Sequence, residues 1–127
     1  MKPRLMPTSV PTRAPPRPPA LGSLLENLKP GAAEEEFTEL FTRPGLRIER
    51  IVSTGQSSPE GFWYDQPYTE WVLVMAGGAR LRFEGEADAR ELKPGDYAEI
   101  PPHCRHRLDW TEAEPPTVWL AIHIAGE

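Results

Sequence analysis

The amino-acid sequence predicts one small all-β domain, either a sandwich or a barrel. Two observations support this fold class. From Leu46 onward, short segments with alternating apolar residues are separated by turns rich in Gly, Pro and Asp. No stretch between these segments has the apolar spacing of a helix. The length of 127 residues is enough for one domain with one hydrophobic core.

Residues 1–20 are predicted to form a disordered or polyproline-like tail. They contain seven of the sixteen prolines and few large apolar side chains. Burial therefore cannot offset the conformational entropy that this segment would lose on ordering. The plainest interpretation is a dispensable tail, and the alternative is a proline-rich ligand for the aromatic groove of a partner protein.

Residues 21–45 are predicted to be a short helical segment. The four leucines between Leu21 and Leu28 follow a helical spacing. A second helix is expected from Ala32 to Thr42, because the acidic residues 34–36 suit the positive end of a helix.

The β domain is expected to span residues 46–127. Its predicted strands are 47–53, 71–75, 79–84, 89–92, 97–100, 105–110 and 117–124. The strand 71–75 is apolar on both faces and should be covered on both. In the last strand, Trp119, Ala121 and His123 share one face, opposite the apolar residues at even-numbered positions.

Charge and composition exclude several classes of function. The net charge is −5, and the first 20 residues carry four basic side chains and no acid, which leaves −9 on the remainder. Such an acidic body argues against nucleic acid as a partner. No apolar run suits a membrane helix or a secretory signal, so a cytoplasmic protein is expected. The single cysteine, Cys104, excludes an internal disulfide and fits a reducing compartment.

The stretch from Gly61 to Gly77 is the first candidate for a binding site. Three consecutive aromatic residues are followed by polar side chains, just before an apolar strand. Large aromatic groups beside polar groups at a strand entrance favour a lined pocket. The aromatic residues are Phe62, Trp63 and Tyr64, and the polar ones are Asp65, Gln66 and Glu70.

Two motifs in the chain resemble those of the cupin superfamily. Gly95, Pro101 and His106 have the spacing of the second cupin motif, in which the histidine binds metal. Glu70 and Gly77, with six residues between them, match the end of the first motif. The resemblance covers about residues 46–125. It implies a jelly-roll barrel, also called a double-stranded β-helix, preceded here by the short N-terminal helices.

The sequence departs from both motifs. The two histidines of the first motif are replaced by Tyr64 and Gln66 or, with a longer gap before the glutamate, by Trp63 and Asp65. In the second motif, His103 stands where the family usually has Gly. The chain is similar to compact single-domain bacterial cupins that carry a GFWYDQ-type segment.

The resemblance also implies a metal site, because cupins usually hold a divalent metal with three histidines and one glutamate. Glu70 and His106 stand at ligand positions, and His123 could join them if its face of the last strand points inward. With Asp65 or Gln66 added, these ligands would suit zinc, iron, manganese or nickel. The alternative is a buried hydrogen-bonded pair of Glu70 and His106 without metal.

The remaining candidates also have two interpretations each. Tyr64 either moves a proton together with Glu70 or belongs to the pocket wall with its hydroxyl satisfied. Asp65 is either a base or the cap of a turn, and His103 either contacts a ligand or faces solvent on its turn. The expected ligand-binding residues are Trp63, Asp65, Gln66 and His103.

Three functions remain open from the sequence. The first is a metal-dependent cupin enzyme, namely an oxygenase, isomerase, decarboxylase or lyase that acts on a small polar metabolite. The second is a metal-free module that binds or senses a small molecule. The third is an interaction role for the proline-rich tail. The resemblance to small cupins also implies a homodimer that pairs through the outer sheet.

Overall fold

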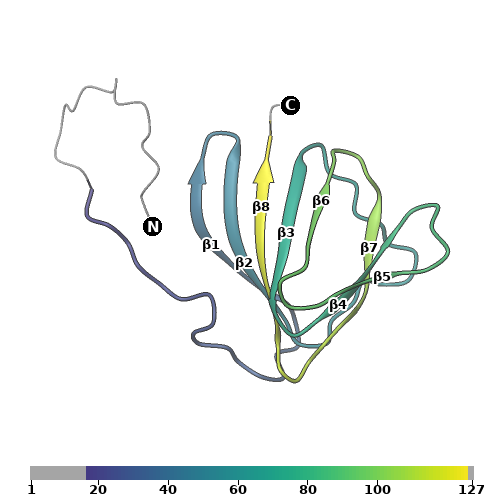
Figure 1. The fold of residues 1–127 in the computed structure, drawn as a ribbon, viewed down its shortest axis with the longest axis horizontal. Coiled ribbons are helices and arrows are strands. Elements are labelled where there is room, and N and C mark those ends of the chain that lie inside the picture. The colour runs from purple at the N-terminus through teal and green to yellow at the C-terminus, as the bar shows by residue number, and fades with distance from the viewer. Residues whose placement is uncertain (1–16, 126–127) are drawn as a thin grey trace.

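Eight strands in two antiparallel sheets make up the fold (Figure 1). The computed structural model describes residues 17–125, so most of the predicted tail, residues 1–16, lies outside the described residues. The strands are β1 (Glu36–Arg43), β2 (Leu46–Ser53), β3 (Thr69–Ala76), β4 (Ala79–Phe83), β5 (Arg90–Leu92), β6 (Tyr97–Ile100), β7 (His106–Thr111) and β8 (Thr117–Ile124). The predicted all-β fold class is confirmed.

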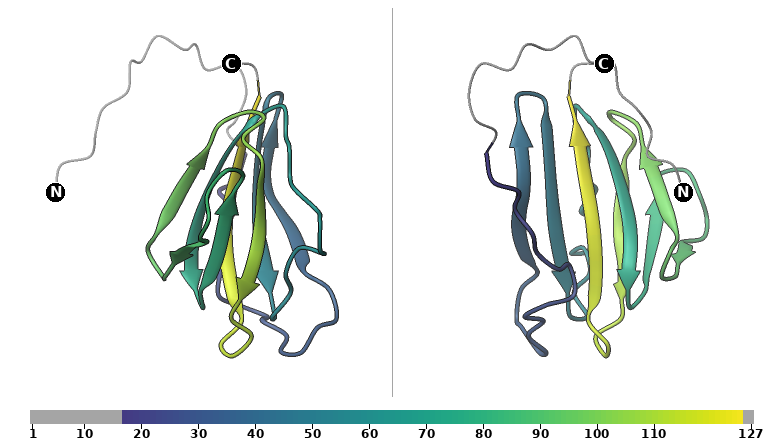
Figure 2. Two further views of the ribbon diagram at one scale, coloured as in Figure 1. Left: turned by 90° about the vertical axis from the view of Figure 1, so that its right-hand side faces the viewer. Right: turned by 60° about the vertical axis from the view of Figure 1, so that its left-hand side comes forward.

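The two sheets face each other and share one hydrophobic core (Figure 2). The larger sheet has the strand order β1-β2-β8-β3-β6, and the smaller has the order β5-β4-β7. Alternation along each strand turns every second side chain into the space between the sheets. The buried core residues are Val72, Val74, Ala79, Leu81, Leu92, Ile100, Leu108, Trp119 and Ala121.

The prediction of two short N-terminal helices is wrong. The segment Leu21–Leu28 consists of turns and bends, and Leu21 is 98% exposed. Most of the expected second helix is strand β1, which pairs along its length with β2. A helix of this length is marginal on its own, whereas pairing with β2 satisfies its backbone groups in a sheet. No helix occurs in residues 17–125.

A buried arginine helps to hold the segment before β1 against the barrel. Arg50 is only 7% exposed, and its guanidinium donates to the carbonyls of Leu24 (3.2 Å) and Glu26 (2.7 Å). It also pairs with the carboxylate of Glu36 at 3.2 Å. The bond to Leu24 takes up a carbonyl group that a helix over residues 21–28 would have paired with the N–H of Leu28.

The turn between β3 and β4 requires glycine. Gly77 has φ of +79°, and a Cβ atom there would lie 2.5 Å from the hydroxyl oxygen of Thr117. Thr117 is fully buried, and its hydroxyl contacts Gly78 N (3.2 Å) and Glu112 O (2.8 Å). A turn is therefore present at Gly77-Gly78 as predicted, but the predicted hairpin is wrong, because β3 and β4 belong to different sheets and the turn joins them.

Strand β8 lies in the middle of the larger sheet and presents His123 to the interior. Trp119, Ala121 and His123 are all buried, as the predicted face assignment requires. The position of β8 between β2 and β3 brings side chains from three strands together at this point. In the described part of the chain, no helix is long and apolar enough to cross a membrane.

Candidate functional site

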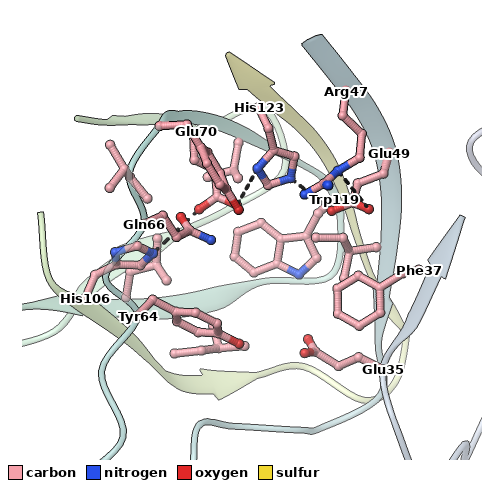
Figure 3. Close-up of a pocket in the computed structure, with 16 residues that line it drawn as sticks. Glu35, Phe37, Arg47, Glu49, Tyr64, Gln66, Glu70, His106, Trp119 and His123 are labelled. Carbon is pink, nitrogen blue, oxygen red and sulfur yellow. Dashed lines mark hydrogen bonds and ion pairs between the residues drawn. The ribbon is translucent and has the colours of Figure 1, made fainter. Parts of the chain in front are cut away.

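A cavity of about 320 Å³ opens between the two sheets (Figure 3). Its apolar lining comes from strands of both sheets, namely from Ile51, Val72, Leu81, Ile100 and Leu108. Its aromatic lining is Phe37, Tyr64, Tyr68 and Trp119. Its polar lining is Glu35, Arg47, Glu49, Gln66, Glu70, His106 and His123. An apolar wall with a few polar groups is typical of a small-molecule site.

Glu70 lies between two imidazoles at the polar side of the cavity (Figure 3). One carboxylate oxygen is 3.5 Å from Nε2 of His106, and the other is 3.7 Å from Nδ1 of His123. All three residues are no more than 9% exposed. Glu70 and His123 are register partners on β3 and β8, whereas His106 comes from β7 in the other sheet.

His106 is oriented by a backbone carbonyl. Its Nδ1 is 2.8 Å from the carbonyl oxygen of Cys104, so Nδ1 carries a proton and Nε2 faces Glu70. Burial alone lowers the pKa of His106, but the hydrogen bonds to Glu70 and to the Cys104 carbonyl, together with the charge of Glu70, raise it above 6.5. The imidazolium form is therefore favoured beside the buried carboxylate.

His123 shares its other nitrogen with a second carboxylate. Its Nε2 is 2.9 Å from Oε1 of Glu49, which can only accept, so Nε2 carries a proton. Its Nδ1 is buried and has no hydrogen-bond partner. The side-chain oxygen of Gln66 is likewise buried without a partner. These unsatisfied atoms lie in the same cavity wall and mark a place where a bound molecule would gain hydrogen bonds.

Backbone hydrogen bonds of Tyr64 hold the loop before β3 against β7. Its backbone N donates to the carbonyl of His106 at 2.6 Å, and the N of His106 donates back to Tyr64 at 3.1 Å. The two rings stack with centroids 5.4 Å apart. Burial raises the pKa of the Tyr64 hydroxyl, and the charges of Glu35 and Glu70 raise it further. The hydroxyl therefore stays protonated at neutral pH and can donate a hydrogen bond into the cavity.

Only one of the two possible motif alignments places its residues in the cavity. Tyr64 and Gln66 line it, whereas Trp63 and Asp65 do not. Asp65 instead pairs with His103 at 2.8 Å, and both side chains are exposed. Of the expected ligand-binding residues, the structure brings Gln66 to the cavity and places Trp63, Asp65 and His103 outside it.

Several cavity residues were not singled out by the sequence. Arg47 and Glu49 lie on the same face of β2, a fact that its alternation could have shown. Glu35 belongs to the acidic run that was assigned to a helix start. Trp119 was predicted on the face of His123, and its indole donates to Ser53 Oγ at 3.2 Å.

The residues at this site do not fit the metal that the family implies. The donor types of Glu70, His106 and His123 would suit a divalent transition metal. However, Glu70 lies between the imidazoles and directs a different oxygen at each of them. Among the described residues, no group of three or more His, Cys, Asp or Glu side chains is arranged to hold a metal ion.

Comparisons with known proteins agree with this architecture. A family model for the cupin domain matches residues 50–123. The crystal structure of a putative mannose-6-phosphate isomerase from Ralstonia eutropha is 49% identical, with a TM-score of 0.83. The match covers 85% of this chain and 100% of that one. The chain belongs to the cupin family, as its two motifs predict.

More distant structures share the fold. A cupin superfamily protein from Desulfitobacterium hafniense has a TM-score of 0.64 at 16% identity, covering 77% of this chain and 84% of that one. A conserved protein of unknown function from Streptococcus pyogenes has a TM-score of 0.68 at 17% identity, covering 85% and 89%. Comparison with curated proteins finds no match.

Proposed function

We propose that this cupin binds a small polar molecule in the cavity between its sheets, without a resident metal. Glu70 and its two imidazoles orient the molecule, and the aromatic and apolar walls enclose the rest of it. The observation that carries this proposal is the Glu70 cluster itself, which is buried, faces the cavity and leaves His123 Nδ1 without a partner.

The energetics of burial support this function. A buried polar atom without a hydrogen bond costs about 1–3 kcal/mol. Two such atoms, His123 Nδ1 and Gln66 Oε1, lie in the wall of one cavity. A polar ligand would offset this cost, whereas a purely apolar ligand would not. The cavity volume of about 320 Å³ is at the lower end of the usual range for small-molecule sites.

An enzyme that moves a proton is the second candidate function. The His106–Glu70 pair favours it, because a buried carboxylate beside an imidazolium is an acid–base pair. In such an enzyme Glu70 would accept a proton from a carbon next to a carbonyl, and the Tyr64 hydroxyl would donate a hydrogen bond to the carbonyl oxygen. The similar Ralstonia eutropha protein is named a putative mannose-6-phosphate isomerase, which supports the same class of reaction. The metal-dependent enzyme expected from the family would need donors that converge, and these do not.

A ligand screen tests the binding role. The full chain is screened in EDTA against a set of small polar metabolites by thermal shift, and each hit is measured by calorimetry. Glu70→Gln keeps the size of the side chain but removes its charge. We expect the affinity for a hit to fall by about tenfold or more, because a charge-assisted hydrogen bond is lost.

The matched control is Glu84→Gln. Glu84 pairs with Arg105 at 2.8 Å on the surface, away from the cavity residues, so this variant should bind like the unaltered chain. If no metabolite stabilises the protein, or if every hit binds Glu70→Gln equally well, the proposed function is wrong.

A further inference from the structure

The cavity contains more negative than positive groups. Glu35, Glu49 and Glu70 contribute three carboxylates. Arg47 is the one Lys or Arg in its lining, and its Nε lies 3.9 Å from Glu49. Three carboxylates face a single guanidinium in this lining, beside the two imidazoles. An anion would therefore meet net repulsion inside this cavity, and a cation would meet attraction.

Glu35 is held at the cavity wall by a short hydrogen-bond chain. The indole N–H of Trp119 donates to Ser53 Oγ at 3.2 Å, and the Ser53 hydroxyl donates to a carboxylate oxygen of Glu35. Ser53 is fully buried and Trp119 is 5% exposed, so the chain has little freedom. In the described part of the protein no Lys or Arg pairs with Glu35. Its charge is available to a ligand.

The cavity presents oxygen acceptors to a ligand. The side-chain oxygen of Gln66 is buried and has no hydrogen-bond partner. The carboxylate of Glu70 is buried, and its oxygens lie 3.5 Å from Nε2 of His106 and 3.7 Å from Nδ1 of His123, both longer than a typical N–H···O hydrogen bond. A carboxylate and an amide oxygen in one wall need N–H or O–H donors beside them.

Aromatic faces complete the lining. Tyr64, Trp119 and Phe37 surround the open space in the close-up (Figure 3). Aromatic rings attract cations through their quadrupoles, most strongly where water is excluded. The carboxylates, the unpartnered oxygen and the aromatic rings all favour a cationic ligand that can donate hydrogen bonds.

We propose that the ligand of this cavity is a protonated amine that carries N–H groups on a small apolar body. The inference rests on the proposed binding function and names its ligand class. The ammonium N–H groups bind the carboxylate of Glu70 and the side-chain oxygen of Gln66. The apolar body lies against the aromatic and aliphatic walls. A phosphorylated sugar does not fit, because its phosphate would face three carboxylates and only one arginine.

Three probes with the same apolar body separate the possible ligand charges. n-Butylamine is protonated at neutral pH, 1-butanol is neutral and butyl phosphate is an anion. Their affinities for the full chain are measured by NMR titration. We expect n-butylammonium to bind roughly tenfold more tightly than 1-butanol, and butyl phosphate to bind most weakly.

The variant Glu35→Gln identifies the source of the preference. It should weaken n-butylammonium binding several-fold and leave 1-butanol binding unchanged. Glu35 lies in the segment before β1 and is only half-buried, so the fold should tolerate the change, which circular dichroism would verify. Glu70→Gln provides a second loss of charge in the cavity, and Glu84→Gln is the control that keeps wild-type affinities.

Each outcome decides the proposal. If n-butylammonium and 1-butanol bind with equal affinity, or if butyl phosphate binds most tightly, an amine is not the ligand class. The proposed binding function of the cavity would still stand in that case. Saturable binding of none of the three probes would overturn both the ligand class and the proposed function.

Discussion

At the scale of single residues, the departure of this chain from its family motif explains its site. The positions of the two missing histidines are held by Tyr64 and Gln66, which line the cavity. A tyrosine hydroxyl and an amide are hydrogen-bonding groups and poor ligands for a transition metal. Glu70 is kept, and with two metal-binding neighbours gone it pairs with His106 and faces His123. We propose that this motif serves as a hydrogen-bonding site in this chain.

Asp109 gives a prediction about acid stability. It accepts from Arg82 on β4 at 2.6 Å and from Arg107 on β7 at 2.7 Å. Burial raises the pKa of Asp109, but the hydrogen bonds and charges of both arginines outweigh this effect and hold the pKa below 3.8. The stabilisation is therefore present above pH 3.8 and is lost as the pH falls through the lowered pKa of the folded state.

Asp109→Asn should lower the free energy of unfolding by about 1 kcal/mol at neutral pH. The difference from the unaltered chain should narrow as the pH falls below 3.8. Urea titrations at several pH values measure this difference. A difference that stays constant down to acid pH would show that charge does not stabilise this pair of strands.

The sequence identified the centre of the site but not its surroundings. Glu70 and His106 could be found because their spacing belongs to known motifs, and His123 because strand alternation turned it inward. Glu49 could not be linked to His123, since the pair is 74 positions apart and meets only through the contact of β2 with β8. Alternation shows which face a side chain occupies, but not which strand lies beside it.

At the scale of elements, β1 shows how tertiary pairing overrides a local pattern. Its residues Phe37, Leu40 and Phe41 have helical spacing, yet the segment pairs with β2 and contains an irregularity between Glu39 and Phe41. The barrel strands were predictable because their turns are marked by Gly and Pro and their alternation is regular. The sequence alone could not show that β2 would be an edge strand with unpaired backbone groups to which β1 could hydrogen-bond.

The exposed edge of β1 leads to a prediction about assembly. β1 contacts only β2, and Leu40 and Phe41 are 47% and 41% exposed. A free edge with exposed apolar groups is a natural pairing site for a second copy of the same strand. We propose that the chain forms a homodimer through β1, with the two edges antiparallel.

Sedimentation velocity at micromolar concentration tests this assembly. The unaltered chain should sediment as a dimer, and Phe41→Glu should shift it to a monomer, because it places two like charges at a symmetric contact. Tyr97→Glu is the control, since Tyr97 is 65% exposed on β6 at the opposite edge of the sheet. A monomer in the unaltered chain, or a dimer that survives Phe41→Glu, would contradict an interface at β1.

At the scale of the whole molecule, strand order creates the site. The adjacent strands β2, β8 and β3 place Glu49, His123 and Glu70 in a row across the larger sheet. His106 completes the row from β7 of the smaller sheet. Apolar core residues fill much of the space between the sheets, and several of them also line the cavity beside these polar side chains. We propose that a cupin barrel in this form keeps the location of the family's metal site and offers hydrogen bonds there instead.

Native mass spectrometry of the untagged full chain tests this central claim most directly. The protein is produced with zinc, iron, manganese and nickel supplements and measured beside Glu70→Gln. We predict that the chain carries no stoichiometric metal, and that any bound species is a small organic molecule that Glu70→Gln releases. One metal ion per chain, retained by the unaltered protein and lost in Glu70→Gln, would contradict the account.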